Sequence, residues 1–139
     1  MNDLEFMEIA VDEAKKGLEE GGRPIGSLLV LDGKIIGRGR NQGMQKGSVI
    51  LHAEMDAIEN AGRLTREEYV RSTIYTTLSA CLMCSGTIVY LGIQRVVSAD
   101  NTSVMGAEDF LLKNGIELIT IDHPEMIGIF RMYLEKLTK

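Results

Sequence analysis

The order of apolar segments constrains the fold of this chain most strongly. Short segments rich in apolar and β-branched residues lie at 25–31, 34–37, 72–77, 95–98 and 116–121. The first two flank Asp32-Gly33, and two strands joined by an Asp-Gly pair predict an antiparallel hairpin. Each later strand follows a segment with helical spacing, and strands joined through helices lie parallel because the connection crosses over the sheet.

The intervening segments carry apolar residues at helical spacing. They lie at 2–20, 52–61, 81–91, 107–113 and 122–136. Gly62 and Asn114-Gly115 end two of these helices, and Asp122 with Glu125 is predicted to form a capping box that starts the last one. We therefore expect one α/β domain over 1–139, with helices on both faces of a five-stranded mixed sheet. Its last two strands should be parallel.

Composition excludes several classes of protein. Hydrophobic residues make up 45% and charged residues 25%, as in soluble globular proteins. No apolar run is long enough to span a bilayer, and the acidic start is unlike a secretory signal. Two cysteines cannot build a disulfide framework, so a reducing cytoplasm is expected. The net charge of −5 argues against a nucleic-acid partner, which requires a clustered basic surface.

One constellation has the spacing of a catalytic metal site. His52-Ala53-Glu54 is followed by Cys81-Leu82-Met83-Cys84, which offers one imidazole, two thiols and a nearby carboxylate. Residues three apart on a helix share a face, so both thiolates can reach one ion. Three protein ligands leave the fourth zinc position open for water, whose pKa the metal lowers to about 7. Glu54, two positions beyond His52, is then placed to move protons rather than to bind the metal.

The cysteine pair and the second histidine also have other interpretations. The Cys81/Cys84 pair could be a redox site, but such pairs usually follow a first strand, whereas this one lies past the middle of the chain. His123, the other histidine, precedes Pro124 at a predicted helix start, and we expect it to be a solvated residue of the capping region. Neither alternative uses the spacing between His52, Glu54 and the cysteines.

The chain resembles the zinc-dependent nucleobase deaminases, whose signature is H-x-E…P-C-x-x-C. The flanking segments look like those of fungal-type cytosine deaminases over roughly residues 5–135. The matching segments are Glu20 to Gly26, Gly37 to Asn41, Gln45 to Ser48, Glu59 to Leu64 and Tyr75 to Ser79. This resemblance implies a three-layer α/β/α fold and hydrolytic release of ammonia from a free nucleobase, with cytosine as the first expectation.

The resemblance also implies roles for individual residues. His52, Cys81 and Cys84 would hold one Zn²⁺ per chain, and Glu54 would activate water and shuttle protons. The implied substrate-binding residues are Ile25, Asn41, Ala53, Leu78, Ser79, Asp100 and Asn101. Relatives of this type are generally homodimers, so a homodimer is expected as well.

Three departures from the family pattern are present. Ala80 replaces the signature proline, Ala53 stands where the fungal-type proteins carry glycine, and the third, at the C-terminus and in the loop that lacks the family phenylalanine near Val104, bears on substrate choice. The fungal-type enzymes also continue into a segment whose tryptophan and aspartate close over the pyrimidine, whereas Tyr133 and Glu135 are the late aromatic and acidic residues here. Alternatives to cytosine are therefore guanine, isocytosine, a triazine or creatinine, then a tRNA adenosine. A zinc-binding scaffold without activity is the non-enzymatic alternative.

Overall fold

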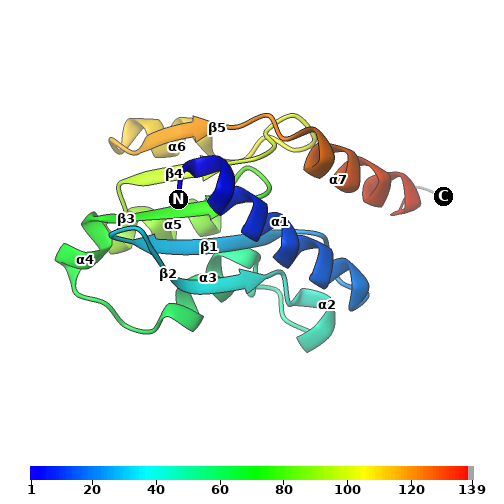
Figure 1. The fold of residues 1–139 in the computed structure, drawn as a ribbon, viewed down its shortest axis with the longest axis horizontal. Helices are drawn as coiled ribbons and strands as arrows, with labels where there is room; N and C mark the ends of the chain where they lie inside the picture. Colours follow the sequence, from blue (N-terminus) through cyan, green and yellow to red (C-terminus); the bar gives the residue numbers. More distant parts are fainter. Residues whose placement is uncertain (138–139) are drawn as a thin grey trace.

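The predicted hairpin forms one edge of the sheet in the computed structural model, which describes residues 1–137 (Figure 1). β1 (Gly26–Leu31) pairs antiparallel with β2 (Lys34–Arg40). Asp32 and Gly33 have φ angles of 50° and 79°, the positive values that a tight type I′ hairpin turn requires at both central positions. β2 continues to Arg40, three residues beyond the predicted end, and so leads directly into Asn41.

The sheet is mixed, as predicted. Its strand order is β2-β1-β3-β4-β5, with β3 (Ser72–Thr76), β4 (Arg95–Ser98) and β5 (Glu117–Thr120). β1 is antiparallel to both of its neighbours, while β3–β4 and β4–β5 are parallel pairs. Only β1 therefore runs against the others, and the carboxyl ends of β2, β3 and β4 share one edge of the sheet.

Helices cover both faces of the sheet and form the expected three layers (Figure 1). The helices are α1 (Asp3–Glu19), α2 (Gly43–Lys46), α3 (Ala53–Ala61), α4 (Arg66–Val70), α5 (Leu82–Leu91), α6 (Glu108–Lys113) and α7 (Pro124–Leu137). Residues of α1 and α7 share one buried cluster with Leu28 and Tyr75, and residues of α5 and α6 share the other with Leu29 and Ile74. Neighbouring strand residues thus point to opposite faces. None of the helices in residues 1–137 is long and apolar enough to cross a membrane.

Two glycines allow helices to lie directly against the hairpin. A Cβ atom on Gly26 would lie 2.0 Å from the carbonyl oxygen of Ala10 in α1. On the other face, a Cβ atom on Gly39 would lie 2.3 Å from the backbone nitrogen of Ala57 in α3. These close approaches bring the first turn of α3, which carries Glu54, up to the end of β2.

The start of α7 differs from the sequence prediction. The helix begins at Pro124, and His123 is the residue that caps it: Nδ1 of His123 accepts the backbone N–H of Met126 at 3.1 Å. The predicted Asp122–Glu125 capping box is therefore wrong, because the imidazole of His123 caps the N-terminus of α7. His123 is also only 6% exposed rather than solvated, and its Nε2 lies 2.7 Å from Glu8 Oε1. The short helices α2 and α4 were not predicted either.

Candidate active site

Two helix starts bring the three candidate metal ligands together. His52 and Cys81 are the N-cap residues of α3 and α5, and Cys84 lies one turn further along α5. His52 Nδ1 lies 3.4 Å from Cys81 Sγ and 3.6 Å from Cys84 Sγ. All three donor atoms lie within 4.8 Å of one another.

These distances fit a tetrahedral zinc ion. With Zn–S near 2.3 Å and Zn–N near 2.1 Å, tetrahedral angles separate nitrogen and sulfur by about 3.6 Å. Burial, with a smaller contribution from the positive charge of Arg23, lowers the pKa of His52 and favours the neutral imidazole that metals bind. Burial and the neighbouring Glu54 and Cys81 raise the pKa of Cys84, so a cation is required to hold its sulfur as a thiolate. The donor set and its geometry therefore suit Zn²⁺ with one coordination position left open.

Glu54 is buried beside this cluster. Its side chain is in the first turn of α3, and the residue is only 4% exposed. Burial raises the pKa of Glu54 to about 7, against smaller opposing effects from hydrogen bonds. A carboxyl group with a pKa near neutrality can both accept and donate a proton, as a general acid–base group must.

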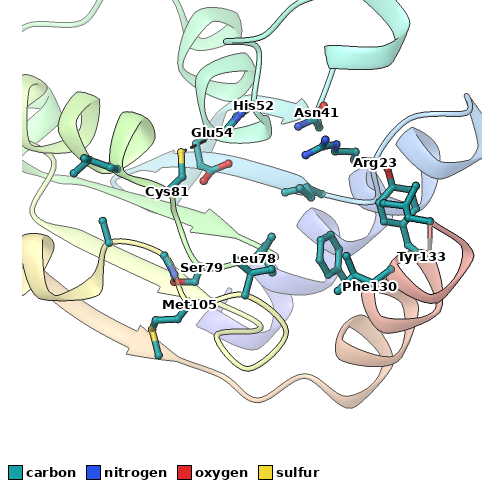
Figure 2. A pocket seen from close by; sticks show the side chains of 17 residues that line it. Arg23, Asn41, His52, Glu54, Leu78, Ser79, Cys81, Met105, Phe130 and Tyr133 are labelled. Atoms are coloured by element: carbon teal, nitrogen blue, oxygen red, sulfur yellow. Dashed lines mark hydrogen bonds between the residues drawn. The ribbon is translucent and has the colours of Figure 1, made fainter.

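A cavity of about 660 Å³ opens above the cluster. Figure 2 shows His52, Glu54 and Cys81 on one side of the cavity and Phe130 and Tyr133 on the other. Within residues 1–137 the lining is Arg23, Ile25, Asn41, His52, Glu54, Leu78, Ser79, Cys81, Leu82, Val104, Met105, Gly106, Ala107, Phe130, Tyr133, Leu134 and Leu137. Most of these side chains are apolar, with a few polar groups, which is the usual character of a small-molecule site.

Asn41 presents an oriented amide to the cavity. It follows β2 directly and is 4% exposed. Its Oδ1 accepts the backbone N–H of Gly43 at 2.9 Å, and its own backbone N–H donates to the carbonyl of Ile25 at 3.0 Å. Because the amide oxygen is engaged, the Nδ2 group is the donor that a ligand in the cavity can use.

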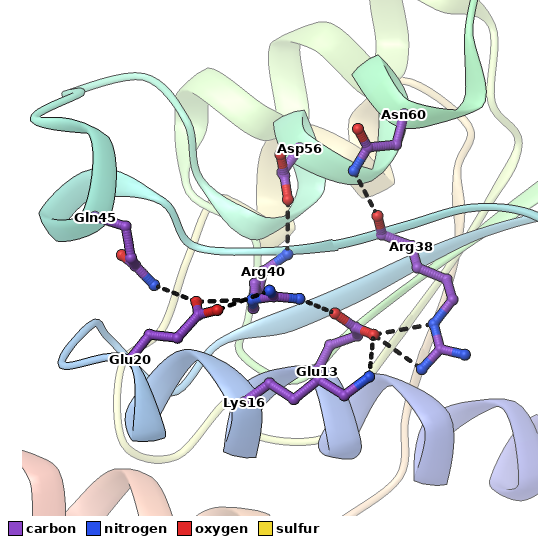
Figure 3. Close-up of polar contacts among 8 residues, drawn as sticks. All are labelled: Glu13, Lys16, Glu20, Arg38, Arg40, Gln45, Asp56 and Asn60. Atoms are coloured by element: carbon purple, nitrogen blue, oxygen red, sulfur yellow. Dashed lines mark hydrogen bonds and ion pairs between the residues drawn. The ribbon is translucent and has the colours of Figure 1, made fainter.

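A network of charged residues holds the strand that ends at Asn41 (Figure 3). The carboxylate of Glu13, only 4% exposed, accepts hydrogen bonds from Arg38 Nε at 3.0 Å and Arg40 Nη1 at 2.8 Å. Glu20 binds the other side of the Arg40 guanidinium. The backbone N–H of Arg40 donates to Asp56 Oδ2 at 3.0 Å, so the end of β2 is tied to α1 on one face and to α3 on the other.

Ser79 lines the cavity, whereas three other residues implied by the resemblance do not. Ala53, the first residue of α3, is completely buried, and all three of Ala53, Asp100 and Asn101 lie outside the lining. Asp100 Oδ1 instead accepts the backbone N–H groups of Thr102 and Ser103, and its carbonyl accepts the N–H of Ser79 at 2.8 Å. Asp100 therefore shapes the loop that leads to the cavity wall at 104–107.

Sequence reasoning missed part of the cavity wall. Phe130, Leu134 and Leu137 line it from α7 together with Tyr133, and Met105 lines it from the loop. The spacing of 130, 133, 134 and 137 is that of one helix face, so a signal existed for the α7 side chains. Arg23 was also missed, although it lies in the Glu20 to Gly26 segment that resembles the family.

Comparisons with known proteins agree with this geometry. The family model of the cytidine and deoxycytidylate deaminase zinc-binding region matches residues 1–100. The chain is 43% identical to a cytosine deaminase of Candida albicans over 97% of this chain and 91% of that protein. It is 37% identical to a tRNA-specific adenosine deaminase of Streptococcus pyogenes over 76% of this chain and 67% of that protein.

The fold has solved counterparts as well. A structure from a study of A-to-I editing by tRNA:A34 deaminases superposes with a TM-score of 0.78 at 28% identity, covering 91% of this chain and 99% of the other. The family match spans the strand that precedes Asn41 and the two helix starts that carry His52, Cys81 and Cys84. The chain belongs to the zinc-binding cytidine and deoxycytidylate deaminase family, whose members are hydrolases acting on C–N bonds.

Proposed function

We propose that this protein deaminates a free nucleobase, with cytosine as the first substrate, to give uracil and ammonia. The observation that carries the proposal is the position of Glu54, buried at the base of an apolar cavity beside a donor set that suits zinc. The cytosine deaminase of Candida albicans is similar over nearly the whole chain, which favours cytosine over other rings.

His52, Cys81 and Cys84 would hold the zinc ion. When bound there, zinc lowers the pKa of a coordinated water molecule to about 7 and supplies a nucleophile near neutral pH. Glu54 takes the proton from the attacking water and passes it to the ring nitrogen as the new C–O bond forms. It then carries the second proton to the amine, the C–N bond breaks, and ammonia leaves.

Substrate orientation follows from the polar and apolar walls of the cavity. The Nδ2 group of Asn41 donates to the ring carbonyl, while Ile25 and Leu78 contact the faces of the ring. Phe130 closes the opposite wall from α7. With the carbonyl held by Asn41, the carbon that bears the amine faces Glu54 and the zinc ligands.

We also propose that the protein forms a homodimer through the helices beside the metal site. α5 is apolar on all sides, yet Leu82 is 65% exposed and Tyr90 is 80% exposed. A helix with apolar residues all round is normally buried, so a second copy of the chain would cover this face. Sedimentation equilibrium tests this: a monomer at micromolar concentration contradicts the dimer.

Metal analysis and one substitution test the mechanism. We expect about one zinc per chain in the purified protein, and Glu54→Gln should retain the metal but abolish ammonia release. Glu59→Gln is the matched control, since Glu59 is exposed on the same helix and lies outside the cavity lining. Protein without zinc would contradict the metal assignment, and loss of zinc in Glu54→Gln would make Glu54 a ligand.

A screen for ammonia release identifies the ring. Cytosine, isocytosine, guanine, adenine, creatinine and cytidine are tested with the zinc-loaded protein, together with an RNA stem-loop that carries a target adenosine. We expect the highest kcat/KM on cytosine. Activity on cytidine but on no free base would overturn the free-base proposal, and zinc binding without ammonia release from any compound would favour the scaffold.

A further inference from the structure

Arg23 occupies a position between two cavities. It lines the cavity above Glu54, and it also lines an adjoining recess of about 250 Å³ whose other walls are Asn41, Gly43, Met44, Ser48, Val49 and His52. In Figure 2 its guanidinium points toward Asn41 and His52. A group that extends from a ring held by Asn41 would therefore meet Arg23 as it enters the recess.

The backbone at Arg23 is fixed, so its side chain starts from a defined point. The N–H of Gly22 donates to the carbonyl of Gly17 at 2.8 Å, and the N–H of Ile25 donates to the carbonyl of Arg23 at 2.9 Å. The intervening Pro24 restricts both its own φ angle and the conformation of Arg23. Because the backbone at Arg23 is already ordered, less conformational entropy is lost when its side chain binds a ligand.

The guanidinium of Arg23 makes no hydrogen bond or ion pair within residues 1–137, whereas Arg38, Arg40, Arg71 and Arg95 each bind a carboxylate. Among the residues that the structure describes, it is the only lysine or arginine side chain that lines the cavity, and none of the acidic ones lines the recess. Other exposed cations such as Arg63 also lack an ion pair among the described residues, so what distinguishes Arg23 is its position at the wall of both cavities.

The remaining polar groups of the recess are donors too. Asn41 offers Nδ2, since its Oδ1 is engaged by Gly43. Ser48 Oγ accepts the backbone N–H groups of Ile50 and Leu51, so its proton is left to donate. A guanidinium, an amide N–H and a hydroxyl around one recess match the acceptor oxygens of a carboxylate or phosphate.

We propose that Arg23 and this recess form a subsite for an anionic substituent, so that an aminated heterocycle carrying a carboxylate or phosphate is deaminated in preference to its neutral counterpart. This inference rests on the proposed function, because the ring to which the substituent is attached occupies the site above Glu54. In cytosine, ring position 1 lies opposite the carbon that bears the amine. A substituent at position 1 therefore points away from Glu54.

Two cytosine derivatives that differ only in charge test the subsite. These are 1-carboxymethylcytosine and its neutral carboxamide. A charge-assisted hydrogen bond corresponds to at least about a tenfold preference for the acid in kcat/KM. Arg23→Gln should bring the acid-to-amide ratio close to one. Comparing kcat/KM for cytidine 5′-monophosphate and cytidine shows whether the subsite recognises a phosphate as well as a carboxylate.

Arg63→Gln is the matched control. Arg63 is also exposed and makes no ion pair within the described part of the chain, but it lies outside both cavities. The ratio should persist in this variant. The subsite is overturned if the wild type has equal kcat/KM for the acid and the amide, or if Arg23→Gln leaves their ratio unchanged. Turnover of cytosine in the same experiment would leave the proposed function intact.

Failure of the proposed function gives a different result. In that case no compound, cytosine included, releases ammonia. Calorimetric binding of the acid and the amide to zinc-loaded Glu54→Gln, and to the same protein with Arg23→Gln added, then decides the subsite alone. Acid-selective binding that disappears with Arg23 supports it, and binding without selectivity overturns it.

Discussion

Replacing Glu13 by glutamine perturbs the charged network behind Asn41 while changing almost no volume. The Glu13 carboxylate accepts from Arg38 at 2.8 Å and 3.0 Å and from Arg40 at 2.8 Å, with Lys16 at 3.4 Å (Figure 3). Glutamine keeps one oxygen but turns an NH2 group toward donors. The Glu20 carboxylate still binds Arg40.

The expected loss follows from these contacts. Charge-assisted hydrogen bonds contribute about 1.5–3 kcal/mol each. The Arg38 side chain is 44% exposed, so solvent partly screens its interaction with Glu13. The Glu13 side chain, in contrast, is only 5% exposed. We therefore expect Glu13→Gln to lower the free energy of unfolding by about 2–3 kcal/mol at pH 7, the equivalent of one buried charged bond and a mispaired amide.

The pH dependence makes the prediction specific. Burial alone would raise the pKa of Glu13, but the hydrogen bond from Arg40 and the charge of Arg38 outweigh it and lower the pKa below its ordinary 4.5. The stabilisation is therefore complete above pH 4.5 and is lost as the pH falls through the lower pKa of the folded state. The difference between wild type and Glu13→Gln should shrink in that acidic range.

Urea unfolding followed by circular dichroism, repeated from pH 7 to acidic pH, measures both effects. Glu20→Gln is the control, because Glu20 binds the same Arg40 but its side chain is 40% exposed, and its substitution should cost less. A loss in Glu13→Gln that is no larger than that in Glu20→Gln, or one that does not change with pH, would refute the assigned role of the buried carboxylate.

Four further substitutions test the backbone, packing and hydrogen bonding around the site. Ala80→Pro should stabilise the protein by about 0.4–1 kcal/mol in thermal unfolding without changing zinc content, because the Ala80 N–H donates no hydrogen bond within residues 1–137. Gly26→Ala should destabilise it by about 3 kcal/mol, since the added methyl group meets the α1 backbone, whereas Gly128→Ala, with free space in α7, should gain about 0.5–1 kcal/mol. Asp56→Ala removes the acceptor at the end of β2 and should cost about 2 kcal/mol and raise KM, measured by urea unfolding and steady-state kinetics.

Much of the candidate site could be predicted because its geometry is local. His52 and Glu54 lie at the start of one helix, and Cys81 and Cys84 lie one turn apart at the start of another. Helical spacing by itself sets which side chains share a face. The hairpin was equally predictable, because the Asp32-Gly33 turn depends only on backbone conformations that these two residues tolerate.

The remaining features depend on contacts between distant segments. His123 is buried against Glu8, 115 residues earlier in the sequence, and so caps α7 instead of facing solvent. Phe130 reaches the cavity only because α7 packs against the same sheet face as α1.

The sequence by itself therefore determined the donor set, the position of the carboxylate beside it and the mixed sheet, since periodicity and spacing act within a few residues. Only the tertiary structure decided which side chains line the cavity, and that Arg23 lies there with no hydrogen bond or ion pair to the described residues. Both depend on how strand order and helix packing bring remote segments together, and no local pattern in the chain encodes that arrangement.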